Sequence, residues 1–104
     1  MKYYSNDIYP VALVLSFDAE SVDKEYYNAC ERRTNDYFAM AVGIIFNKKE
    51  PSIRLQAHEA FHATRMIAEI GCHIYLDDQS EEAWAYLQGW VMKCIDEFLK
   101  EEQP

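Results

Sequence analysis

His58, Glu59 and His62 are the residues of this sequence whose types and spacing point most directly to chemistry. The segment is His-Glu-Ala-Phe-His, and residues four apart on a helix lie one turn apart on the same face. Both imidazoles could therefore bind one metal ion. Glu59 would lie near that ion and could accept a proton from a water bound to it. The segment predicts a metal site with its own general base.

A possible third ligand follows downstream in the sequence. Zinc in a catalytic site usually has three protein ligands and one open coordination position. Nineteen residues separate His62 from Glu82, and we predict Glu82 as the third ligand. Glu81, Asp77 and Asp78 are alternatives that the sequence leaves open.

The motif, the nineteen-residue spacing and the glutamate together resemble the zinc-ligand pattern of the gluzincins, the thermolysin-like metallopeptidases. The resemblance covers residues 57 to about 90, roughly a third of the chain. It implies that zinc is bound by His58, His62 and Glu82 and that Glu59 is the general base. It also implies hydrolysis of an amide bond.

The sequence departs from related patterns at three positions. Metzincins need glycine at position 65 and histidine at position 68, and this chain has Arg65 and Ala68. Thermolysin-like enzymes commonly carry an aspartate four residues after the glutamate ligand, where this chain has Tyr86. The partner that would orient a ligating histidine is therefore open. Residues 58–90 also resemble short uncharacterised proteins of phages and mobile elements.

Three further side chains near the motif could take part in catalysis. His73 could stabilise an oxyanion or add a ligand, and the Tyr75 hydroxyl could polarise a carbonyl. His73 also fits an ordinary exposed loop residue, and Tyr75 also fits a core or loop aromatic. Arg65 could attract a substrate carboxylate or form an ion pair with Glu69, and we prefer the ion pair.

The elements that must position these residues begin with two apolar runs. Residues 11–17 are rich in β-formers and predict a central strand, and residues 36–46 predict a second strand. Between them, residues 21–33 fit a short helix. The edge near residues 38–46 could bind an extended peptide by strand addition. The length favours a single domain, residues 1–104.

Two helices are predicted in the second half. The motif helix spans residues 52–71 and has a glycine C-cap, and after a loop a final helix runs to about residue 100. The apolar stripe of this final helix comprises Trp84, Leu87, Val91, Cys94, Ile95 and Phe98. Glu82 lies away from that stripe, on the side of Ala85 and Gly89. We infer that these small residues let the motif helix approach and bring Glu82 to the metal.

The predicted fold class is therefore α+β. We expect a minimal zincin-like unit, in which a small antiparallel or mixed sheet packs on the motif helix and a long C-terminal helix. The net charge of −8, from 18 acidic and 10 basic residues, argues against nucleic-acid binding. We expect no signal peptide and no membrane span. The three cysteines, Cys30, Cys72 and Cys94, are expected to be reduced. Together these expectations predict a cytoplasmic protein.

The function predicted from the sequence is a zinc-dependent peptidase-like hydrolase with a peptide or protein substrate. The alternative is a zinc-stabilised binding module, an inhibitor or adaptor without turnover. A third interpretation is a plain scaffold with a chance motif and no metal. An apolar content of 50% in so short a chain is also compatible with a homodimer.

Overall fold

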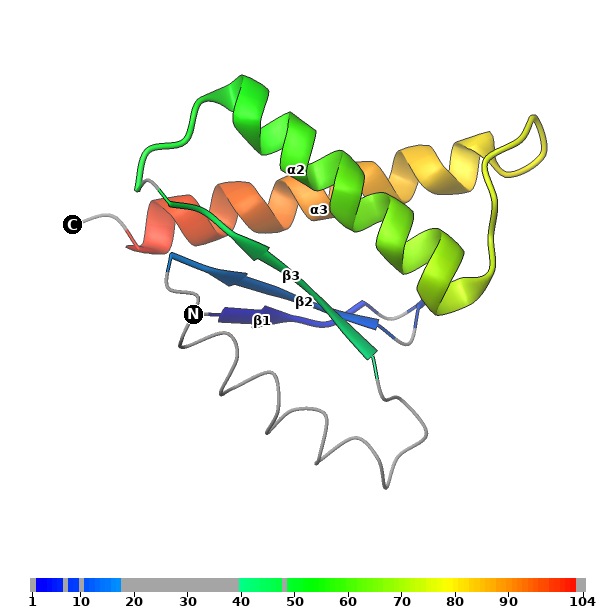
Figure 1. The fold of residues 1–104 in the computed structure, drawn as a ribbon, viewed down its shortest axis with the longest axis horizontal. Helices are drawn as coiled ribbons and strands as arrows, with labels where there is room; N and C mark the ends of the chain where they lie inside the picture. Colours follow the sequence, from blue (N-terminus) through cyan, green and yellow to red (C-terminus); the bar gives the residue numbers. More distant parts are fainter. Residues whose placement is uncertain (1, 7, 10, 18–39, 48, 103–104) are drawn as a thin grey trace.

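The computed structural model describes residues 2–6, 8–9, 11–17, 40–47 and 49–102. They form an α+β fold, as predicted, in which two helices cover one face of a three-stranded sheet (Figure 1). The elements are β1 (Lys2–Tyr4), β2 (Val11–Ser16), β3 (Met40–Ile45), α2 (Ile53–Arg65), η1 (Met66–Gly71) and α3 (Glu81–Glu102). The helix predicted over residues 21–33 lies outside the described residues.

The sheet is mixed and has the order β1-β2-β3. β2 is antiparallel to β1 and parallel to β3, with Leu13 opposite Val42 and Leu15 opposite Ile44. Every residue of β2 is buried, which confirms the predicted central strand. β1 was not predicted, because three residues are too few to show an alternating pattern.

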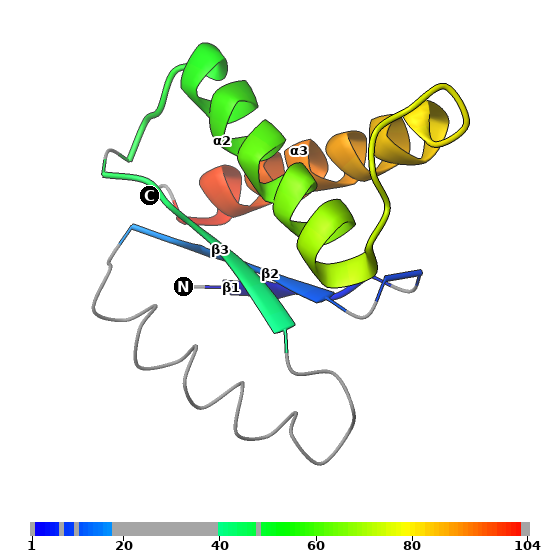
Figure 2. The ribbon, with the colours of Figure 1, turned by 45° about the vertical axis from the view of Figure 1, so that its right-hand side comes forward.

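The main core lies between the sheet and the two helices, which cross above it (Figure 2). β2 contributes Val11, Leu13 and Leu15 to this core. The predicted apolar stripe of α3 is confirmed, because all six of its residues are buried. This packing holds α2 with one face against the core and the other directed outward.

The motif helix, formed by α2 and η1, begins and ends close to where the sequence predicts. The Ser52 hydroxyl caps it by accepting the Leu55 N–H at 3.1 Å. The last turns are the wide turns of η1, which ends at Gly71, and the C-cap is the next residue, Cys72, rather than the expected Gly71. The residue with left-handed backbone is His73, with φ 56°, and the Ile74 N–H closes the end on the Ala68 carbonyl at 2.8 Å.

The loop before α3 is organised by Asp77. Its Oδ1 accepts the backbone N–H groups of Gln79 and Ser80, each at 2.8 Å. These hydrogen bonds hold the pKa of Asp77 below its ordinary value, because they stabilise the carboxylate.

In the described ranges no helix combines the length and the apolarity needed to cross a lipid bilayer.

Candidate metal centre

His58 and His62 are both exposed on the outward face of α2. The opposite face of the helix is buried through Ala60, Ala63 and Thr64. The Nε2 atoms of the two histidines lie 3.1 Å apart, and the ring centroids are 4.8 Å apart with an interplanar angle of 74°. The two Nε2 atoms thus converge on one point above the helix.

This geometry fits two ligands of a single zinc ion. Tetrahedral zinc with Zn–N bonds of roughly 2.0–2.1 Å separates two nitrogen ligands by about 3.3 Å. The observed 3.1 Å is close to that separation. The same distance also fits one hydrogen bond in which one imidazole donates and the other accepts. Zinc binding would replace this hydrogen bond.

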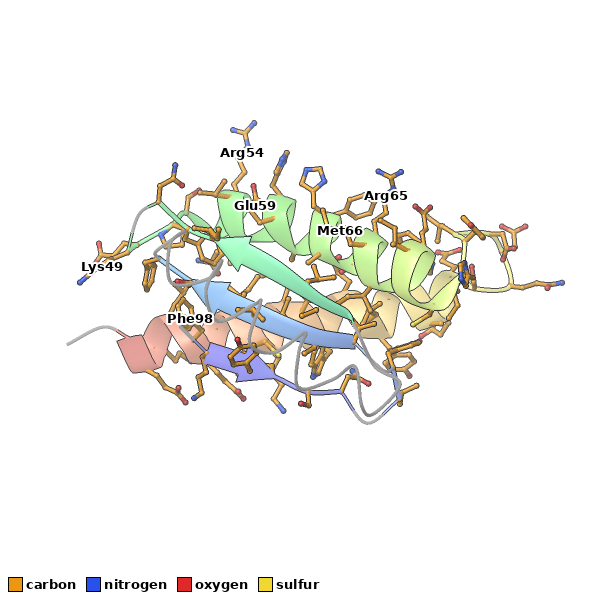
Figure 3. The ribbon with its side chains drawn as sticks, turned by 60° about the horizontal axis from the view of Figure 1, so that its bottom comes forward. Lys49, Arg54, Glu59, Arg65, Met66 and Phe98 are labelled. Atoms are coloured by element: carbon orange, nitrogen blue, oxygen red, sulfur yellow. The ribbon has the colours of Figure 1, made fainter. Side chains whose placement is uncertain are left out.

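Glu59 lies beside the histidine pair on a different flank of α2. Its side chain is half-buried. Figure 3 shows Glu59 and Met66 on the flank toward β3, whereas Arg54 and Arg65 project away from the sheet. A carboxylate on this flank could reach a molecule lying between the histidine pair and the edge of β3.

Glu82 is not grouped with the histidine pair in this structure. It is exposed in the first turn of α3. Among the described residues, no three His, Cys, Asp or Glu side chains gather as a metal-binding group. Neither Glu82 nor its alternatives Glu81, Asp77 and Asp78 therefore completes the site in this arrangement.

The inference that the Ala85 and Gly89 side of α3 approaches α2 is wrong. Ala85 and Gly89 are exposed, and a Cβ added to Gly89 would meet nothing within 4 Å. α2 contacts a different side of α3, on which the Phe61 and Trp84 ring centroids lie 6.2 Å apart. The two large rings set this contact, and the small residues face outward.

A polar contact fixes α2 on α3 beneath the histidine pair. The Thr64 Oγ1 lies 2.7 Å from the Ala60 carbonyl and 2.8 Å from the side-chain amide of Gln88. The hydroxyl has one proton. If it donates to Ala60, the Gln88 amide must present its NH₂ group to Thr64. This contact links the part of α2 that carries the motif to α3. The sequence pattern did not indicate it.

Gly89→Ala is expected to stabilise the protein by about 0.5–1 kcal/mol, because alanine is the better helix former and the position is open. Urea unfolding of the metal-free protein measures this change. Wild-type zinc affinity should be retained. A loss of several kcal/mol would instead mean that another element packs closely on Gly89.

His73 and Tyr75 lie in the loop between η1 and α3, and both are exposed. Within the described chain, neither side chain forms a hydrogen bond to the histidine pair. Two side chains hold the loop through its backbone carbonyls. The Ser80 hydroxyl donates to the Tyr75 carbonyl, and the Trp84 Nε1–H donates to the Ile74 carbonyl. The catalytic roles of His73 and Tyr75 stay predictions.

Arg65 forms the ion pair preferred from the sequence, with its Nε 2.7 Å from the Glu69 carboxylate. Arg54, one turn before His58, is exposed and points outward from α2 (Figure 3).

A scan against protein-family models, a search of curated proteins and a search of solved structures each found no match to this chain.

Proposed function

We propose that the protein is a zinc-dependent, peptidase-like hydrolase that cleaves an amide bond, built as a minimal zincin-like unit. The observation that carries the proposal is the convergence of His58 and His62, whose Nε2 atoms are 3.1 Å apart. The position of Glu59 directly after the first histidine supports it.

His58 and His62 would hold the zinc through their Nε2 atoms. Bound zinc would supply Lewis acidity and lower the pKa of a water ligand toward neutrality. Glu59 would accept a proton from the attacking water and donate it to the leaving amine. His73 or Tyr75 would donate a hydrogen bond to the developing oxyanion if the loop brings either one close.

The edge of the sheet supports a peptide as the substrate. β3 is last in the sheet order and, within the described residues, pairs only with β2. An extended peptide could add to the side of β3 that faces away from β2, by backbone hydrogen bonds. Glu59 lies on the flank of α2 toward β3 (Figure 3), so a bound peptide could lie within its reach.

Glu82 is proposed as the third zinc ligand from its spacing after His62 and the gluzincin resemblance. It is exposed in the first turn of α3. In the enzyme proposal the third ligand must come from another carboxylate or from a rearrangement of the loop before α3. Two histidines alone would bind zinc more weakly than three protein ligands.

The second candidate function is a zinc-stabilised binding module without turnover. The outward position of the histidine pair favours it, because both rings are exposed on a convex helix surface. A shallow hollow lined by Glu50, Pro51, Gln56, Asp96, Leu99 and Lys100 includes neither histidine. A partner protein could supply the missing ligand at such an open site.

Glu59→Gln is expected to abolish hydrolysis and to preserve zinc binding. Loss of a general base typically lowers the rate by about 10²- to 10⁴-fold, and we expect the hydrolysis rate to fall by about that factor here. The measurement is cleavage of a random peptide mixture followed by mass spectrometry, with zinc content determined for the same samples. Zinc-dependent hydrolysis by the wild type that persists in the variant would reject Glu59 as the base. Zinc binding without any hydrolysis in the wild type would favour the binding module.

We further propose that the protein works in the cytoplasm. Cys72 and Cys94 are free thiols, which suits a reducing compartment. Burial raises the pKa of the Cys94 thiol to about 11 and also raises that of Cys72, which disfavours the reactive thiolate at both positions.

A further inference from the structure

The histidine pair on α2 provides half of a zinc coordination shell. Structural zinc sites have four protein ligands in a tetrahedron, and catalytic sites usually have three. His58 and His62 offer two, and their Nε2 separation of 3.1 Å fits neighbouring positions on one ion. Among the described residues, no further His, Cys, Asp or Glu side chain gathers with them. This part of the chain therefore leaves two positions of a tetrahedral ion to be filled.

The pair lies where a second molecule can reach it. Both rings are exposed on the outward face of α2, opposite the buried face that packs on the core. Next to them, Ala57 is exposed, and Phe61 is 49% exposed although its ring lies against Trp84. Two crossing helices approach most closely at one point. A second helix could therefore reach an ion held above α2 without any change in the core.

We propose that a second copy of this chain completes the site, so that one zinc ion is held by His58 and His62 of each copy. The proposal rests on zinc binding at the pair, as proposed above. A two-fold axis through the ion brings the same surface patch together from both copies. Each copy then supplies two of the four ligands of a tetrahedral ion.

Tetrahedral coordination also fixes how the two copies meet. The two ligand pairs of a tetrahedron lie in perpendicular planes, and His58 and His62 follow one another along α2. The two α2 helices would therefore cross steeply. Arg54 and Arg65, which point away from the sheet (Figure 3), start about 8–9 Å along the helix from the midpoint of the pair. In a steep crossing, these helix positions of the two copies are more than about 10 Å apart, beyond the Debye length at physiological salt.

The charge of the chain makes the ion necessary for this association. Each chain carries −8, so two chains together carry −16, twice that value. Such like-charged chains repel one another, and the patch around the pair has few apolar side chains beyond Phe61. The positive ion supplies the attraction by binding both copies. We therefore expect monomers without zinc and dimers with it, since binding and association are linked.

The dimer would also control the chemistry of the site. Four histidine ligands leave no open position for water or substrate. Hydrolysis would then belong to the monomer, and the zinc-bridged dimer would be a form without turnover. In the alternative function, a binding module, the second copy would be the partner.

The test is a zinc titration of the full chain, followed by sedimentation velocity and by mass spectrometry under native conditions. The protein should be monomeric in chelator. The dimer should reach its maximum at about one zinc ion per two chains, because one ion serves two copies. It should decrease again in excess zinc, because each histidine pair then takes an ion of its own.

Three variants assign the dimer to the histidine pair. His58→Ala and His62→Ala should each stay monomeric at every zinc concentration. Both side chains are exposed, so the fold should be retained, which circular dichroism checks. His73→Ala removes an exposed histidine outside the pair and should dimerise as the wild type does. A dimer that persists in chelator or in His62→Ala would overturn the proposal.

Zinc content and peptide cleavage separate this proposal from the proposed function. A monomer that holds one zinc ion per chain and cleaves peptides would overturn the dimer and retain the hydrolase. A zinc-bridged dimer, with no cleavage at any zinc concentration, would retain the dimer and reject the hydrolase. A chain that binds no zinc would overturn both.

Discussion

His62→Ala is expected to lower zinc affinity by about 100-fold or more. Even residues that only orient a metal ligand commonly contribute about 10- to 100-fold, and His62 would be a direct ligand. Its Nε2 lies 3.1 Å from that of His58, so its removal leaves a single imidazole at the site. Competition with a chromophoric chelator measures the affinity at neutral pH.

His73→Ala is the matched control, because it removes an exposed histidine outside the pair. It should keep wild-type affinity. Equal losses in both variants would mean that zinc is not bound at the pair. Glu82→Ala is expected to change affinity far less than His62→Ala, since Glu82 is not grouped with the pair among the described residues. A loss as large as that of His62→Ala would restore Glu82 as the third ligand.

Phe98→Ala is expected to destabilise the metal-free protein by about 3–5 kcal/mol, the usual cost of removing a buried phenylalanine. Phe98 is fully buried, with 0% exposure, and its ring stacks on Phe17 with a centroid distance of 5.0 Å. A domain of this size is stable by only about 5–15 kcal/mol. A large share of the protein should therefore be unfolded at mild urea concentrations.

The control for Phe98→Ala is Tyr86→Ala on the same helix, where the side chain is 74% exposed. Its effect should be within about 0.5 kcal/mol. Unfolding is followed by far-ultraviolet circular dichroism in the presence of a chelator, so that metal binding adds nothing to stability. Similar midpoints for the two variants would contradict the packing described for α3.

The sequence predicted the elements whose patterns are local. The period of the α3 stripe, the β-rich run of residues 11–17 and the start of the motif helix near Ser52 each depend on a few neighbouring residues, and each is present in the structure. The end of the motif helix was predicted to within one residue, but its form was not. The last turns are the wide turns of η1, the C-cap is Cys72 rather than Gly71, and the left-handed backbone falls on His73.

Of the candidate site, the convergence of His58 and His62 follows from their spacing on one helix. The position of Glu82 depends on which side of α3 meets α2, and helical periodicity alone does not fix that choice. Small residues at 85 and 89 suggested one side, whereas the rings of Phe61 and Trp84 and the Thr64–Gln88 contact occupy another. Such contacts join residues more than twenty positions apart.

The order of the strands has a consequence for how the chain folds. β2 is the most buried strand, and the elements that bury it, β3 and α3, come later in the sequence. Pairing of β2 with β3 places Val11 beside Met40, so it brings together two segments that are far apart in the sequence. During synthesis the apolar segment Val11–Ser16 leaves the ribosome before β3 and α3, and it is fully covered only when α3 has emerged. For that interval it resembles an aggregation-prone strand, and we expect that rapid folding or chaperone binding protects it.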